Sequence, residues 1–233
     1  MGFYIDWKAK MQSGESVYKF VDEFIKSYHP SVESLKIDDE AELEAAYYVL
    51  HETALSVFID VLKELKELPG LSPQDVPCFS NMENGASRLN ELLSFAPNGL
   101  TFSEAGYQLM DSIEAAAQKK YGENQSKLAA IMSLVELSNT RPIVVRPTAW
   151  GNYLTRYSFS EKKPVLKKLL LRDACVQNIL CRALRGPVSY RDIVAFLSDS
   201  TKKRRRTNVK YLINFILSDT EYEISMSNID WEV

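Results

Sequence analysis

The densest group of side chains that could do chemistry is a run of five consecutive cations at residues 202–206. An α-helix advances about 100° per residue, so a helix that starts here would bury one stripe and expose the opposite one. The buried stripe would consist of Val209, Leu212, Ile213 and Ile216. The exposed face would be basic and polar, with one aromatic ring, and would consist of Lys203, Arg204, Thr207, Lys210, Tyr211 and Asn214.

Such a face carries the groups that recognise nucleic acid. Lys and Arg neutralise phosphates and can read guanine in the major groove, and Asn can form two hydrogen bonds with adenine. We therefore expect contacts with double-stranded DNA from the whole stretch and from one residue of the preceding helix: Lys202, Lys203, Arg204, Arg205, Arg206, Thr207, Lys210, Tyr211, Asn214 and Arg191. Runs of cations also occur at protein interfaces and on solvated helix starts, and these two alternatives stay open.

Catalytic and metal-binding motifs are not recognisable in the sequence. Glu64 and Lys66, with Asp60 ahead of them, have the residue types of a metal-dependent nuclease. They fall inside a long helical pattern, however, where Asp60 and Glu64 are surface neighbours four residues apart. The histidines and cysteines lack the spacing of a ligand set or disulfide framework: His29, His51, Cys78, Cys175 and Cys181. We expect a protein without catalytic residues, metal or cofactor.

The elements around the basic run follow the order of a winged helix-turn-helix. Residues 166–184 have the apolar periodicity of a helix, residues 185–188 form a turn, and Ser189 can cap a short second helix. The basic helix comes third, and the alternation over residues 222–226 predicts a strand on the side of the wing. In this arrangement the third helix enters the groove and the second crosses the DNA backbone.

An internal similarity suggests a second unit of the same kind. Residues 99–109 and 144–154 both contain an apolar residue, then Thr, Gly, an aromatic residue and Leu. A helix starting near residue 122 lies between the two phrases, and a short β-branched strand at 143–145 leads into the second one. The similarity predicts that the two phrases occupy equivalent places in two tandem folds.

The N-terminal region has a different pattern. Residues 13–28 read as an amphipathic helix, and residues 38–68 read as a much longer one that ends at Pro69-Gly70. The long helix carries a heptad-like seam, which we expect to bind a partner protein or a second copy of the chain. The seam residues are Leu43, Tyr47, Leu50, Ala54 and Val57.

Charge is distributed unevenly along the chain. Residues 1–118 contain 8 Lys/Arg and 20 Asp/Glu, whereas residues 119–233 contain 20 Lys/Arg and 11 Asp/Glu. The basic half suits a polyanion and the acidic half suits a protein partner. No apolar run reaches about 18 residues, and the first residues lack a signal-peptide pattern. We therefore expect a cytoplasmic protein that does not enter a membrane.

One segment resembles a known group of proteins. The order Leu197-Ser-Asp-Ser-Thr, then Arg-Arg-Arg-Thr-Asn-Val at 204–209 and Leu-Ile-Asn-Phe-Ile at 212–216, resembles the last helices of winged-helix modules in prokaryotic restriction and other defence proteins. The phrase Gly-Glu-Asn-Gln-Ser-Lys-Leu-Ala at 122–129 is similar to helix starts in the same group. The resemblance covers residues 120–230 and implies DNA binding. Proteins of that group carry or accompany a nuclease, for which this sequence shows no motif.

These patterns predict a mainly α-helical protein in three parts. They are an acidic helical partner-binding or dimerisation region at 1–79, a winged-helix-like unit at 80–160 and a C-terminal winged helix at 161–233. The expected function is non-catalytic DNA binding, in transcription regulation or as the DNA-contacting subunit of an antiviral defence complex. The alternative is a protein–protein adaptor, a structural subunit of a larger assembly such as a chromosome-organising complex.

Overall fold

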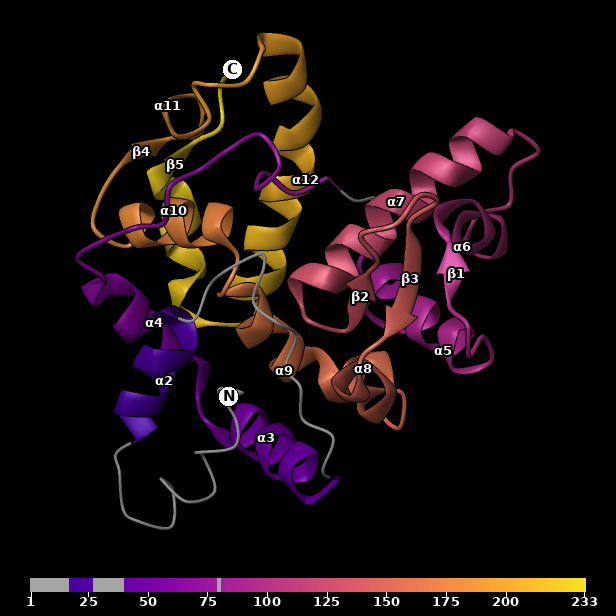
Figure 1. Cartoon of the computed structure of the whole chain (residues 1–233). Coiled ribbons are helices and arrows are strands. Elements are labelled where there is room, and N and C mark those ends of the chain that lie inside the picture. Colours follow the sequence, from indigo (N-terminus) through magenta and orange to yellow (C-terminus); the bar gives the residue numbers. More distant parts are fainter. Residues whose placement is uncertain (1–16, 27–39, 79–80) are drawn as a thin grey trace. The chain divides into compact units, whose positions relative to one another are not determined.

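The computed structural model describes residues 17–26, 40–78 and 81–233, which are mainly helical (Figure 1). The described residues form two compact units, each assembled from separate stretches of chain. Unit 1 comprises 40–52 and 81–166, and unit 2 comprises 17–26, 53–78 and 167–233. The structure therefore divides the chain differently from the predicted 1–79, 80–160 and 161–233, because the N-terminal helices are shared between the two units.

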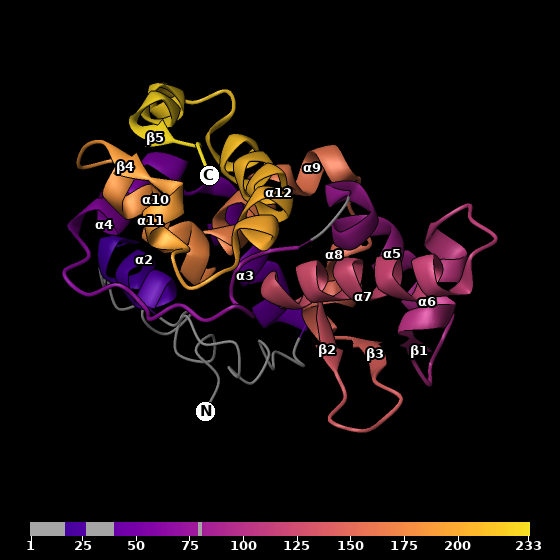
Figure 2. The ribbon, with the colours of Figure 1, turned by 90° about the horizontal axis from the view of Figure 1, so that it is seen from above.

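Unit 1 combines helices with one small antiparallel sheet. The sheet has the order β1-β3-β2, with Leu100 opposite Val145 and Val135 opposite Pro147 (Figure 1). In Figure 2, the loop that joins β2 to β3 projects away from the helices of this unit. The elements are α3 (Glu40–Glu52), the π-helical turn η1 (Asn84–Arg88), α5 (Leu89–Ser94), β1 (Leu100–Thr101), α6 (Phe102–Leu109), α7 (Ala115–Ile131), β2 (Val135–Leu137), β3 (Val144–Pro147), α8 (Ala149–Leu154) and α9 (Phe159–Leu170), whose last residues belong to unit 2.

The crossing of α6 and α7 depends on two glycines. A Cβ atom at Gly106 would overlap the backbone carbonyl of Gln118, and one at Gly122 would overlap the carbonyl of Phe102. The two helix backbones therefore touch directly, which no larger residue permits. Thr101 fixes the start of α6 through a reciprocal capping box with Glu104.

The two similar phrases adopt similar local structures within a single fold. Each runs from a strand through a threonine N-cap into a helix: Thr101 accepts a hydrogen bond from the Glu104 amide, and Thr148 accepts one from the Gly151 amide. The two strands concerned, β1 and β3, are neighbours in the same sheet. The prediction of two tandem folds built on these phrases is therefore wrong, although the strand-to-helix equivalence is real.

Unit 2 contains the basic helix. Its core includes Phe24, Phe58, Ile179 and Ile213, which are all fully buried. The strands β4 and β5 pair in parallel, with Val188 opposite Ile229. The elements are α2 (Val17–Lys26), α4 (Leu55–Glu64), α10 (Ala174–Ala183), β4 (Val188–Ser189), α11 (Tyr190–Ile193), α12 (Asp199–Leu217), the 3-10 helix η2 (Glu221–Asn228) and β5 (Ile229–Asp230).

Four predicted elements differ from the observed ones. The helix expected at 166–184 is interrupted, because α9 ends at Leu170 and α10 begins at Ala174, and the helix expected to start near residue 122 begins at Ala115. The long helix at 38–68 is interrupted, because α3 ends at Glu52 and α4 begins at Leu55, with an extended backbone at Ala54 (ψ 139°). The sequence has neither Gly nor Pro at this break. Because the break lets α3 pack in unit 1 and α4 pack in unit 2, tertiary packing overrides the local helix propensity here. The strand expected at 222–226 is part of the 3-10 helix η2.

Among the described residues, no single helix is both long and apolar enough to cross a membrane, and one bent pair, Leu43–Glu52 with Leu55–Glu64, meets the length and composition only jointly.

Candidate nucleic-acid interface

Helix α12 has the two faces that its sequence predicts. Val209, Leu212, Ile213 and Ile216 are fully buried. The opposite face is exposed and consists of Lys203, Arg204, Thr207, Lys210, Tyr211 and Asn214. The helix carries six cationic side chains against one carboxylate, that of Asp199. The predicted separation into an apolar and a basic face is therefore confirmed.

Three of the five consecutive cations are engaged within the chain. Lys202 is only 7% exposed, and its Nζ atom lies 3.2 Å from Asp199 Oδ1. Arg205 donates hydrogen bonds to the carbonyls of Pro73 and Val76, the latter at 2.7 Å. Arg206 donates to the carbonyl of Trp231 at 3.2 Å. Arg205 and Arg206 therefore tie α12 to other segments of unit 2, and Lys202 is buried beside a carboxylate of its own helix. This corrects the expectation that the whole run faces a ligand.

The helical wheel already carried a signal for this division. Measured from Val209, Lys202 falls at about 20°, Arg205 at about −40° and Arg206 at about 60°, all on the side of the buried stripe. Lys203 and Arg204 point away from that stripe. Within the described part of the chain, neither of these two side chains makes a hydrogen bond or an ion pair with another residue.

Arg191 adds a further cation near the start of α12. It is exposed on α11, whose N-cap Ser189 accepts a hydrogen bond from the Asp192 amide. The pKa of Asp199 is lowered, chiefly by its hydrogen bond with Lys202 and also by the charges of Arg191 and Lys203. The pKa of Asp199 is thus lowered by three nearby cations, Lys202, Arg191 and Lys203. The N-terminal end of α12 therefore has a positive electrostatic environment.

The chain after η2 returns to the side of α12. The ring of Trp231 lies 5.5 Å from the ring of Tyr190, and Lys210 Nζ lies 6.0 Å from the centre of the Trp231 ring. The sequence analysis assigned no role to Trp231. Its position beside Lys210 had no local signal, because the two residues meet through the pairing of β5 with β4.

The outer face of α7 in unit 1 is less basic. Lys119, Lys120 and Lys127 are exposed. Glu123 lies between two of them, with its carboxylate oxygens 2.9 Å from Lys120 Nζ and 2.6 Å from Lys127 Nζ. Burial raises the pKa of Glu123, but the hydrogen bonds and charges of Lys127 and Lys120 together lower it by more. The net shift of this pKa is therefore downward. This carboxylate therefore neutralises part of the face.

The predicted partner-binding seam is not a continuous surface. Leu43 and Leu50 are buried in unit 1. The Tyr47 ring stacks on that of Tyr157 at 4.0 Å. Ala54 and Val57 lie beyond the helix break in unit 2, where Ala54 is exposed and Val57 is half-buried. The prediction of one continuous seam is therefore wrong, since its first three residues contribute to the packing of unit 1 and the last two belong to unit 2. Association of this region with a partner or a second copy stays a prediction.

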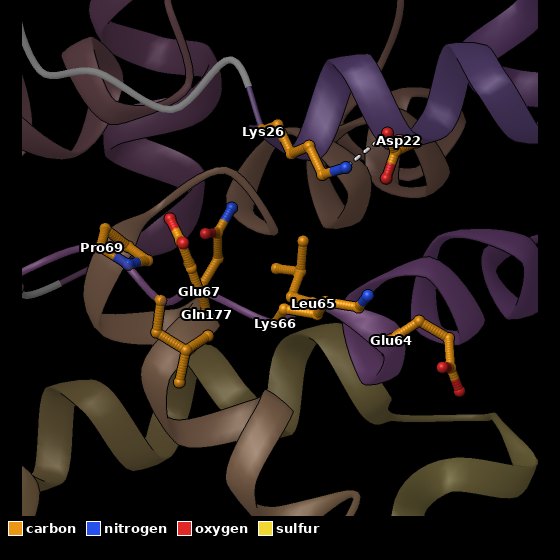
Figure 3. A pocket seen from close by; sticks show the side chains of 9 residues that line it. Asp22, Lys26, Glu64, Leu65, Lys66, Glu67, Pro69 and Gln177 are labelled. Atoms are coloured by element: carbon orange, nitrogen blue, oxygen red, sulfur yellow. Dashed lines mark hydrogen bonds and ion pairs between the residues drawn. The ribbon is translucent and has the colours of Figure 1, made fainter.

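The candidate nuclease residues do not gather into a metal site. Glu64 and Lys66 line a pocket of about 610 Å³ in unit 2, together with Glu67 and an Asp22–Lys26 ion pair (Figure 3). Its charges are mixed in sign. Among the residues that the structure describes, no group of three His, Cys, Asp or Glu side chains could hold a metal ion.

One of the two histidines lies in the part of the chain that the structure describes. His51 is hydrogen-bonded to the neighbouring Glu52 side chain at 2.9 Å and stacks on Tyr47. His29 lies outside the described residues.

No protein-family model matches the chain, and no curated protein or solved structure matches it significantly.

Proposed function

We propose that this protein binds double-stranded DNA through the exposed face of α12. The observation that carries the proposal is the separation of the helix into a fully buried apolar stripe and an exposed basic, polar face. Because the stripe anchors the helix in the core of unit 2, the exposed face is held rigidly. A rigid helix with this composition fits the major groove of B-DNA.

The exposed side chains divide into two roles. Lys203, Arg204 and Lys210 would neutralise phosphates, which supplies affinity for any sequence. Asn214 would contribute the part of the affinity that depends on the DNA sequence, and so would Arg204 if its side chain reaches a base edge. Arg191 on α11 would contact the backbone beside the groove, as the helix before a recognition helix does.

We infer in addition that unit 1 is a winged-helix fold. From α5 to β3, its elements follow the order helix, strand, helix, helix, strand, strand, and its third strand lies between the other two. Unit 2 has a comparable set of three helices, α10, α11 and α12, but a 3-10 helix follows where an antiparallel wing would be. The biological settings that fit are transcription regulation and DNA contact within an antiviral defence complex.

An adaptor role is the second candidate, and unit 1 favours it. Two of the lysines on the outer face of α7 are paired with Glu123, which weakens attraction to a polyanion. Unit 1 also exposes large apolar side chains: Phe95, Tyr107 and Ile113. Such residues are more typical of protein contacts than of phosphate contacts. The two roles are compatible, with unit 2 binding DNA and unit 1 binding a protein.

The test compares two double variants of unit 2. Lys203→Ala/Arg204→Ala removes two cations from the proposed face, and Lys66→Ala/Arg182→Ala removes two exposed cations from elsewhere in the same unit. Fluorescence anisotropy with a labelled duplex should show roughly tenfold weaker binding for the first variant and little change for the second. Equal affinity of the first variant and the parent would remove α12 as the DNA-binding element.

A further inference from the structure

The C-terminal segment 229–233 is fixed against the side of α12. Its first residue, Ile229, is buried and pairs with Val188 in the β4–β5 sheet. The carbonyl of Trp231 accepts the hydrogen bond from Arg206, one turn before Lys210 on the same helix. The segment is thus held at both the strand and the helix.

Side chains in this segment alternate between the two sides. Ile229, Trp231 and Val233 are buried or half-buried, whereas Asp230 and Glu232 are exposed. An extended chain places successive side chains on opposite sides. The Trp231 ring therefore faces the protein, and the two carboxylates face solvent.

The Trp231 ring has Tyr190 on one side and the Lys210 ammonium on another, at 5.5 Å and 6.0 Å. Tyr190 is fully buried, so it gives the tryptophan a fixed support. Lys210 is exposed, and a lysine side chain has considerable rotamer freedom to lose on binding a ligand. An aromatic face near its ammonium restricts that freedom through a cation–π interaction.

We propose that Trp231 is a positioning residue of the DNA-binding face, which holds Lys210 in place for contact with a phosphate. This inference rests on the proposed function of α12. The segment 229–233 then borders the recognition helix on the side where a wing would lie. Trp231 acts through Lys210 and not through Arg204, which lies about 120° away around the helix.

The experiment is a double-mutant cycle on DNA affinity. Trp231→Leu keeps an apolar side chain against Tyr190 but removes the π face, and Trp231→Phe keeps the π face as the conservative control. We expect Trp231→Leu to weaken binding of a labelled duplex by about two- to fivefold, and Trp231→Phe to restore most of that affinity. In the Lys210→Ala background, Trp231→Leu should have no further effect, because the group it positions is gone.

A matched cycle with Arg204→Ala provides the control. There the effect of Trp231→Leu should persist in full, since Arg204 lies about 120° around the helix from Lys210. Full additivity in the Lys210 cycle, or equal affinity of the Leu and Phe variants, would overturn the inference. Circular dichroism and urea unfolding of each variant separate these results from loss of folding.

The outcome also distinguishes this inference from the proposed function. Weaker binding by Lys203→Ala/Arg204→Ala together with unchanged binding by Trp231→Leu would overturn only the positioning role. Equal binding by the parent and the Lys203→Ala/Arg204→Ala variant would overturn both.

Discussion

Asp173 is an ionisable residue in the core of unit 2, where it is 3% exposed. It caps α10 by accepting a hydrogen bond from the Val176 amide at 2.9 Å. Burial raises its pKa from 3.8 to about 7, against the opposing effect of the amide hydrogen bonds. A carboxyl whose pKa is higher in the folded state stabilises the fold only while it is protonated.

We therefore expect the stability of unit 2 to depend on pH through Asp173. Its contribution is fully present below about pH 4 and is lost as the pH rises through about 7, a change on the order of 4 kcal/mol. Asp173→Asn keeps a capping side chain but does not titrate, so it should flatten this dependence. Urea unfolding of both proteins between pH 5 and pH 8 measures the effect, and parallel curves would contradict it.

Lys162 is the corresponding buried cation in unit 1. It is 1% exposed, and its Nζ atom donates to the carbonyl of Leu154 at 3.3 Å. Burial lowers its pKa, and the charge of Glu91 opposes that shift only in part. The ammonium group is thus costly to keep in this position.

Lys162→Met should consequently stabilise unit 1, because Met has a similar length and carries no charge. The expected gain is about 1–2 kcal/mol near neutral pH. It should shrink as the pH approaches about 10.4, where lysine in the unfolded chain also loses its proton. Thermal unfolding at pH 7 and pH 10 provides the comparison; a variant that is destabilised at both pH values would contradict the prediction and show that the hydrogen bond to Leu154 outweighs the cost of burying the charge.

At the scale of elements, the sequence predicts some features far better than others. The faces of α12 could be predicted because a 19-residue helix repeats its apolar period several times. The roles of its cations could not be fully predicted, because the Arg205 acceptors lie about 130 residues earlier in the chain. The break between α3 and α4 could not be predicted, because no Gly or Pro marks it. The strand expected at 222–226 rested only on the alternation of polar and apolar residues, and the segment forms the 3-10 helix η2 instead.

The contact between α6 and α7 gives a prediction for an element pair. Gly122→Ala should strongly destabilise unit 1, because the added methyl group would meet the Phe102 carbonyl and the helix backbones would have to separate. Gly186→Ala is the matched control, since a Cβ atom there meets nothing within 4 Å. Thermal unfolding should show a clear loss of stability for the first variant and little for the second, and similar melting of both would contradict the described crossing.

For the whole molecule, the domain boundaries predicted from the sequence differ from the observed units. The change from acidic to basic composition near residue 118 suggested two regions in sequence order. The chain instead builds each unit from separated stretches, and the N-terminal helices are divided between the two. Compositional halves do not determine which segments pack together, because packing depends on contacts between residues far apart in sequence.

The central claim, that unit 2 binds duplex DNA through a small set of exposed cations, is tested most directly by a salt titration. Lys203, Arg204, Lys210 and Arg191 are exposed, whereas Lys202 is buried and paired with Asp199 of the same helix, and Arg205 and Arg206 are bonded to other segments of unit 2. Each phosphate contact contributes about −0.9 to the slope of log K against log salt concentration. The account predicts a slope of about −3 to −4 for the parent and about −2 for Lys203→Ala/Arg204→Ala. No measurable binding of the parent at low salt, or the same slope for both proteins, would contradict it.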